Sequence, residues 1–108
     1  MKDPIEIIRE HIDQSEMLAQ LAEEASELAH VALKLRRAYD GTNPTPVTRR
    51  QAYSQLLEEY GDIFACTIAL GFNRGIDKMQ IGKSAQEKLE RWEERLTAKE
   101  ENHDDGEA

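Results

Sequence analysis

Apolar residues along this chain recur at intervals of three and four instead of alternating, and this spacing is typical of helices and not of strands. Turn-forming residues interrupt the pattern weakly at 13–15, strongly at 40–46, where two prolines and a glycine fall together, and again at 71–75. The pattern therefore predicts an all-α fold of one short and three long helices. Their expected ranges are about 4–12, 14–39, 48–71 and 76–98.

Two of the expected helix starts carry recognisable sequence signals. Pro4 suits the first turn of a helix, where its missing N–H is not needed. Thr48, with Gln51 three residues later, forms the pattern of a capping box. These signals indicate that helices begin close to residues 4 and 48.

Residues 63–72 (IFACTIALGF) carry no charge and are apolar on every helical face. A helix of this kind is normally buried on all sides. We therefore expect 48–71 to be a central helix, with the amphipathic helices 14–39 and 76–98 packed around it. The expected architecture is a four-helix bundle completed by homo-oligomerisation, as a homodimer or homotetramer.

Composition narrows the class of protein. The chain has 108 residues, with 39% hydrophobic and 33% charged, and 22 acidic against 14 basic side chains give a net charge of −8. This indicates one domain, which we place at 1–98, followed by a polar, acidic tail at 99–108 that we expect to be disordered. A net negative charge disfavours binding to a nucleic acid polymer, which depends on clustered Lys and Arg.

Compartment and membrane association can be addressed from the same sequence. No stretch approaches the ~20 apolar residues of a membrane span, so we expect no membrane association. The start of the chain has no uninterrupted apolar signal region. The single cysteine, Cys66, excludes a disulfide within the chain and a cysteine-based zinc site. A cytoplasmic protein is the simplest expectation.

One carboxylate falls where an apolar residue is expected. On a helix with 100° per residue, five apolar side chains lie within about 60° of Glu24, and Glu24 is therefore in the middle of the stripe that should enter the core. These side chains are Met17, Leu21, Leu28, Val31 and Leu35. Glu27 lies at the edge of the stripe. A carboxylate in a core costs several kcal/mol unless it is paired or binds a metal ion.

The next long helix repeats this arrangement. Glu59 and Asp62 are three residues apart, on one side of the helix, immediately before the uncharged segment. Two helices thus each offer a pair of acids at inward or boundary positions, and four carboxylates facing one another would repel. Hard divalent cations with oxygen ligands relieve this repulsion. The pattern predicts a site for Mg²⁺, with Mn²⁺ as a substitute, held by Glu24, Glu27, Glu59 and Asp62.

The two acidic patterns resemble the motifs of a known family. Residues 23–27 read EExxE and residues 59–62 read ExxD, and they lie in that order on consecutive expected helices. In this respect the chain resembles the MazG-like, all-α nucleoside triphosphate pyrophosphohydrolases over about residues 14–96. LAEEASELAHVALKLRR resembles the first motif helix, LLEEYGDIFACTIALGF the second, and GIDKMQIGKSAQEKLERWEERL the closing helix.

The resemblance implies a Mg²⁺-dependent hydrolase that converts a nucleoside or deoxynucleoside triphosphate to the monophosphate and pyrophosphate, in nucleotide housecleaning. It assigns the metal ligands to the four carboxylates above. It also places basic residues that contact phosphate on the last helix. These are Lys88, Arg91 and Arg95.

The chemistry needs a group that accepts a proton from water, and a carboxylate not fully used in metal binding can do this. Glu27 and Glu23 are both candidates for this catalytic role. The ordinary interpretation of the three basic residues is a solvated helix face, since Glu87 precedes Arg91 by four positions and favours a surface ion pair.

Two other classes of protein remain as alternatives. Glu27-x-x-His30 has the spacing found in di-iron carboxylate bundles, although His30 lies about 120° from Glu24 around the helix. The second alternative is a non-enzymatic helical module of the same fold, with a regulatory or interaction role and no metal.

Overall fold

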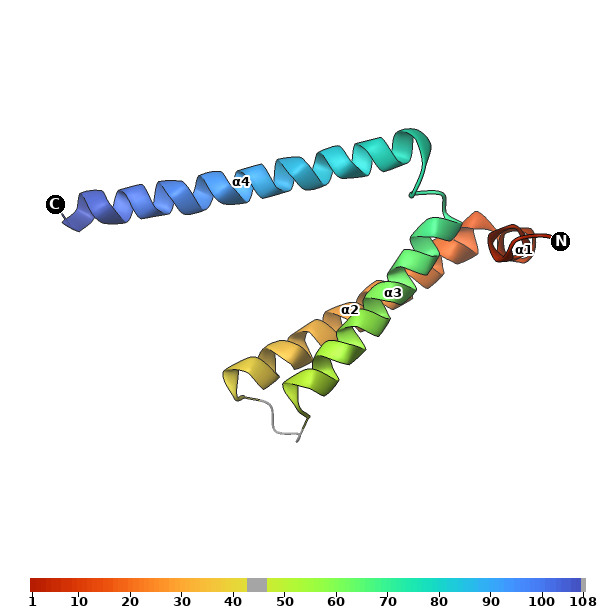
Figure 1. Ribbon diagram of the computed structural model, residues 1–108, viewed down its shortest axis with the longest axis horizontal. Coiled ribbons are helices and arrows are strands. Elements are labelled where there is room, and N and C mark those ends of the chain that lie inside the picture. The colour runs from red at the N-terminus through yellow and green to blue at the C-terminus, as the bar shows by residue number, and fades with distance from the viewer. Residues whose placement is uncertain (43–46, 108) are drawn as a thin grey trace. The chain divides into compact units, whose positions relative to one another are not determined.

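A computed structural model describes the backbone of residues 1–42 and 47–107 and the side chains of 1–42 and 47–100. Every regular element in this described part is a helix, which confirms the predicted all-α class (Figure 1). The helices are α1 (Pro4–His11), α2 (Gln14–Asp40), α3 (Arg49–Ala69) and α4 (Gly75–Glu107). The chain divides into two units, 1–71 with α1 to α3 and 72–108 with α4.

Local signals in the sequence set both ends of α2. The side chain of Asp13 accepts a hydrogen bond of 2.8 Å from the backbone N–H of Glu16 and so caps the start. Gly41 ends the helix with φ 76°, a left-handed conformation that glycine adopts without strain. Part of the predicted break at 40–46, residues 43–46, lies outside the described residues.

The predicted capping box at the start of α3 is confirmed. The backbone N–H of Gln51 donates to the Thr48 hydroxyl, and the backbone N–H of Thr48 donates to the Gln51 side chain, each at 3.1 Å. At the other end, the Arg9 guanidinium of α1 donates to the carbonyl oxygens of Ile68 and Ala69 at 3.1 and 2.9 Å. The Ile68 carbonyl also accepts from the backbone N–H of Gly71 at 2.9 Å, so the bond to Ala69 is the one that satisfies a carbonyl group left unpaired at the helix end.

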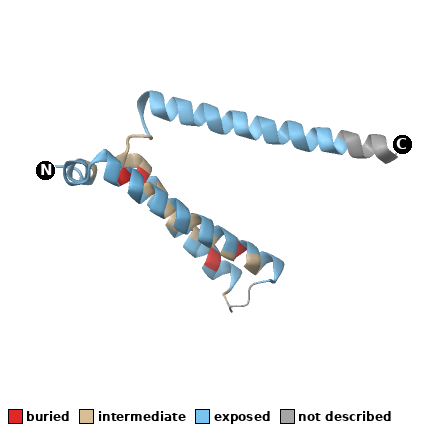
Figure 2. Cartoon of the chain, turned by 180° about the vertical axis from the view of Figure 1, so that it is seen from behind, coloured by how far each residue is buried: buried red, intermediate tan, exposed pale blue. Residues whose placement is uncertain are grey.

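In the first unit, α2 and α3 form an antiparallel hairpin (Figure 1). Its interface contains the four buried side chains of the described residues (Figure 2). They are Met17 and Leu35 on α2 and Ala52 and Cys66 on α3. Leu21, Leu28 and Val31 are half-buried along the same stripe of α2, as the periodicity predicts.

The expectation that residues 63–72 are buried on every face is wrong for the hairpin. Cys66 is buried there, but Phe64 is 52% exposed and Ala65 is also exposed. The physical reason is that, within the first unit, α1 and α2 cover only part of the surface of α3. The segment is apolar as the sequence shows, and part of its apolar surface is not covered by α1 or α2.

The second unit is the helix α4. It begins one residue before the expected start and continues to Glu107, beyond the expected end near 98, because no proline interrupts it. Its last turns overlap the segment predicted to be a disordered tail. The side chains of 101–108 lie outside the described residues, and the division into a domain of 1–98 and a tail of 99–108 stays a prediction. Across the described part of the chain, no helix combines the length and apolarity that crossing a membrane requires.

Candidate metal centre

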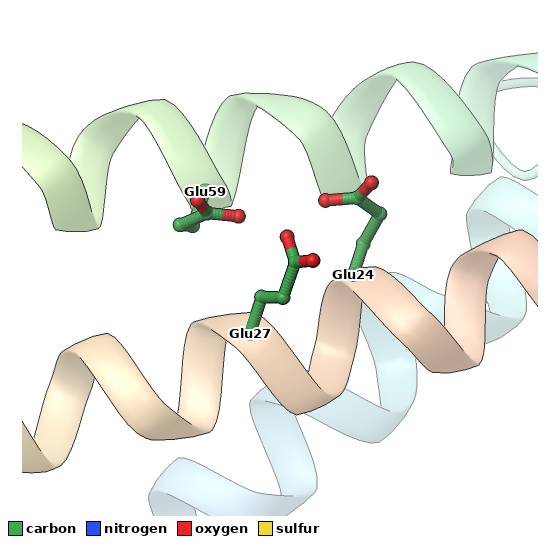
Figure 3. Close-up of side chains that lie close together, drawn as sticks. All are labelled: Glu24, Glu27 and Glu59. Atoms are coloured by element: carbon green, nitrogen blue, oxygen red, sulfur yellow. The ribbon is translucent and has the colours of Figure 1, made fainter.

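Three carboxylates from the two helices of the hairpin converge near its middle. Glu24 and Glu27 extend from α2 and Glu59 from α3, and the three side chains point toward one another (Figure 3). One oxygen from each carboxylate lies within 4.8 Å of those from the other two. The convergence follows from the helical period, which places Glu24 in the stripe of α2 that faces α3.

Burial differs among these acids, and for Glu24 and Glu27 it does so in the way the sequence predicts. Glu24 and Glu59 are half-buried in the interface, whereas Glu27 and Asp62 are exposed at its edge. One oxygen of Glu24, Oε1, accepts a hydrogen bond of 2.9 Å from the Gln20 amide. The second oxygens of Glu24 and Glu59, both Oε2, are buried and have no hydrogen-bond partner among the described residues.

The pKa of Glu24 is raised above its ordinary value of 4.5, first of all because burial disfavours the charged form. The negative charges of Glu27 and Asp62 also raise it, while the hydrogen bond from Gln20 opposes the shift. The Asp62 carboxylate is therefore a close neighbour of Glu24, so the fourth predicted ligand lies beside the cluster.

The pKa of Glu59 is raised for the same reasons. Burial is the largest cause, followed by the charge and proximity of Glu27, with smaller contributions from Asp62 and Glu24. The effect reaches Cys66, where burial raises the thiol pKa and Glu24 and Asp62 add to it. The cluster is thus a region of concentrated negative charge, and no basic side chain of the described residues is among the groups that shift the pKa of Glu24 or Glu59.

These properties fit a divalent cation. Hard cations prefer carboxylate oxygens, and the group offers them from both helices within a short distance. The two buried oxygens without hydrogen-bond partners among the described residues are the strongest local indication, because such atoms in a folded protein call for an explanation, and a bound ion is one of those explanations. The residues that could hold the ion are Glu24, Glu27 and Glu59, with Asp62 adjacent.

The other residues with predicted roles lie outside this group. Glu23 is exposed on α2 beside Glu24, and His30 is exposed one turn beyond Glu27 and is not part of the converging set. The predicted phosphate-binding residues are all exposed on α4, in the second unit, and their relation to the carboxylates stays a prediction. They are Lys88, Arg91 and Arg95.

On α4 these basic side chains have local contacts. The Lys88 ammonium lies 5.0 Å from the centroid of the Trp92 ring, a cation–π geometry. Arg95 donates from Nε to the carbonyl of Arg91 at 3.4 Å. Both contacts are along one helix and exposed, so they leave the charges available to another group.

Sequence reasoning missed Gln20, whose side-chain amide donates a hydrogen bond to Glu24. A signal for it exists, because residues four apart on a helix are neighbours and Gln20 is four positions before Glu24.

A cavity beside α1 is separate from the carboxylates. It measures about 210 Å³ and lies where α1, the start of α2 and the end of α3 meet. Its walls are mostly apolar, with Ile8, Ile12 and Met17 among them. It holds none of the predicted site residues.

Comparisons with family models, with curated protein sequences and with solved structures find no match for this chain. The carboxylate cluster and the sequence motifs that form it are therefore the features of this chain that indicate a function.

Proposed function

We propose that this chain is a Mg²⁺-dependent nucleoside triphosphate pyrophosphohydrolase of the MazG-like type, acting as a homo-oligomer. The observation that carries the proposal is the meeting of the EExxE and ExxD acids across the hairpin, with two buried oxygens that lack hydrogen-bond partners. Acids placed in a helix interface at the expense of stability are explained by a functional ligand.

Hydrolysis of a phosphoanhydride requires neutralisation of phosphate charge and a nucleophile made from water, and bound Mg²⁺ supplies both. The residues that would hold it are Glu24, Glu27, Glu59 and Asp62. Mn²⁺ prefers the same oxygen ligands and would substitute.

The remaining tasks belong to the chain's own side chains. Glu23 or Glu27 accepts the proton of the attacking water, since both are exposed carboxylates, Glu27 within the cluster and Glu23 next to Glu24 in the chain. Lys88, Arg91 and Arg95 contact the phosphates of the nucleotide, for which they supply positive charge. The uncovered apolar surface of the hairpin supports the homo-oligomer.

The test is a hydrolysis assay with a panel of nucleoside and deoxynucleoside triphosphates, Mg²⁺ or Mn²⁺, and measurement of pyrophosphate release. We expect turnover of at least one triphosphate, its loss in EDTA and its recovery when Mg²⁺ is added back. Glu24→Gln and Glu59→Gln should each lower the rate by more than the ~10–100-fold that loss of a ligand-supporting residue costs.

Glu58→Gln is the matched control, because Glu58 is exposed beside Glu59 and outside the cluster. A second readout uses thermal melting, in which Mg²⁺ should raise the melting temperature of the wild type and of Glu58→Gln but not of Glu24→Gln. The absence of turnover for every triphosphate, with Mg²⁺ stabilisation unchanged by Glu24→Gln, would overturn the proposal and favour the non-enzymatic module.

A further inference from the structure

The hairpin has two faces of opposite character, on either side of its interface. The interface positions are the residues of α2 and α3 that face the other helix. Successive residues on a helix are 100° apart, so the residue that precedes each interface position in the chain lies on one face of the hairpin, and the residue that follows it lies on the opposite face. Because α2 and α3 are antiparallel, their corresponding sides fall on the same face of the hairpin. Lys34 and Gln55 both precede an interface position in the chain, and the Lys34 ammonium donates to the Gln55 side chain at 3.4 Å. This hydrogen bond identifies their shared face as the polar one.

The opposite face carries an exposed row of large apolar side chains on α3. They are spaced four, three and four residues apart, and each is about half exposed: Tyr53 51%, Leu57 54%, Tyr60 50% and Phe64 52%. Tyr60 and Phe64 also contact each other edge to face, with ring centroids 5.0 Å apart. We call these four residues the aromatic row. No described residue of the first unit covers it.

Beside the aromatic row, on the same face, α2 carries small side chains at matching intervals. They are all exposed and consist of Ala22, Ala25, Ala29 and Ala32. We call these four residues the alanine row. Protein interfaces pack large side chains against small ones. A surface with a row of large side chains next to a row of small ones is therefore self-complementary when a second copy is rotated by 180° onto it.

We propose that this face binds a second copy of the chain, with the aromatic row of each copy on the alanine row of the other. A two-fold axis parallel to the helices places α3 of one copy over α2 of its partner and gives an isologous interface. A two-fold axis across the helices would place aromatic side chains on aromatic side chains and leave the alanine rows facing each other.

The register of the hairpin supports this arrangement. Glu27 of α2 is level with Glu59 of α3, because their side chains meet. A rotation about an axis parallel to the helices preserves height, so each alanine meets the large side chain that lies at its own level in the hairpin. The resulting contacts follow in order: Ala22 with Phe64, Ala25 with Tyr60, Ala29 with Leu57, and Ala32 with Tyr53.

The interface would leave the carboxylate cluster accessible. Glu27 and Asp62 are exposed toward the polar face, away from the aromatic row. Pairing of two apolar faces forms a four-helix bundle whose two acidic clusters open outward. The inference extends the homo-oligomer of the proposed function and is independent of its metal and nucleotide chemistry.

Sedimentation of the full-length protein over a range of concentrations, without metal or nucleotide, tests the interface. We expect an assembly of at least two chains. Ala25→Arg should weaken it at least about 30-fold, because the change places an unpaired charge in the contact. Ser26→Arg is the matched control, since Ser26 is the next residue, exposed and turned a further 100° from α3.

Cross-linking tests the arrangement itself. In a Cys66→Ala background, Ala29→Cys with Leu57→Cys should give a covalent dimer under mild oxidation, whereas Ser26→Cys with Leu57→Cys should not. A monomeric wild type, as would result if α4 of the same chain covered the face, overturns the inference even if triphosphates are hydrolysed. An assembly unaffected by Ala25→Arg also overturns it. A cross-linked dimer without hydrolysis supports the interface and counts against the proposed function alone.

Discussion

The carboxylates of the interface should make the metal-free protein less stable as the pH rises. The pKa values of Glu24 and Glu59 are raised in the folded chain above the ordinary 4.5. The folded state therefore holds these protons more tightly than the unfolded state does. The slope of the unfolding free energy with pH follows the difference in bound protons, unfolded minus folded. That difference is negative from about pH 4.5 upward, until the folded carboxylates also ionise, and stability falls over this window.

The size of the effect can be counted in protons. The slope of the unfolding free energy with pH is proportional to the difference in bound protons between the two states. Each of the two carboxylates contributes up to about one proton to this difference, which is therefore at most about two protons per chain in the wild type. Glu24→Gln should remove about half of it and raise the stability of the metal-free protein at neutral pH. Asp40 does not interfere, because hydrogen bonds from Thr42 lower its pKa below the ordinary 3.8 and its contribution is lost only at lower pH.

The assay is urea unfolding in EDTA at several pH values and one fixed protein concentration, because assembly makes stability depend on concentration. Glu58→Gln is the control for the loss of a negative charge outside the interface. Stability that increases with pH between 4.5 and 7, or an equal effect of Glu58→Gln and Glu24→Gln on the slope, would refute the reasoning.

Three further predictions concern the hairpin. Thr48→Ala should lower the unfolding free energy by about 1 kcal/mol through loss of the helix cap, with Thr48→Ser as the control in urea unfolding. Arg9→Ala should cost about 0.5–1.5 kcal/mol, because it removes the donor to the Ala69 carbonyl and one of the two donors to the Ile68 carbonyl at the end of α3, and Arg9→Lys should restore only part of this in the same assay. Cys66 should react slowly with a thiol reagent at pH 8 in the folded protein and rapidly in urea, since it is buried with a raised pKa. Equal rates in both states would contradict this.

The sequence predicts the helices and the carboxylate cluster well, for identifiable reasons. Proline, glycine and capping residues are local signals, so the ends of α2 and the start of α3 need no tertiary information. Glu24 is equally accessible to prediction, because the helical period alone places it in the stripe that faces another helix. The pairing with Glu59 follows once two consecutive helices form a hairpin.

Other features depend on contacts that a periodic pattern does not specify. The apolar segment of α3 predicts burial, but periodicity does not specify which other surface covers each side of the helix. Phe64 is exposed in the hairpin because α1 and α2 cover only part of α3. The end of α4 is difficult for a different reason, because a charged segment without proline is compatible with both helix and disorder.

The small number of buried side chains in the hairpin has a calorimetric consequence. The heat capacity change of unfolding follows the apolar area that becomes hydrated, and a compact domain of this length has about 1.3–1.6 kcal/mol/K. Only Met17, Leu35, Ala52 and Cys66 are buried among the described residues, so the hairpin by itself would release little apolar surface. Its melting would be broad, with a shallow dependence on urea. A sharp transition with the full heat capacity change would therefore measure apolar surface of the hairpin that is covered from outside the hairpin.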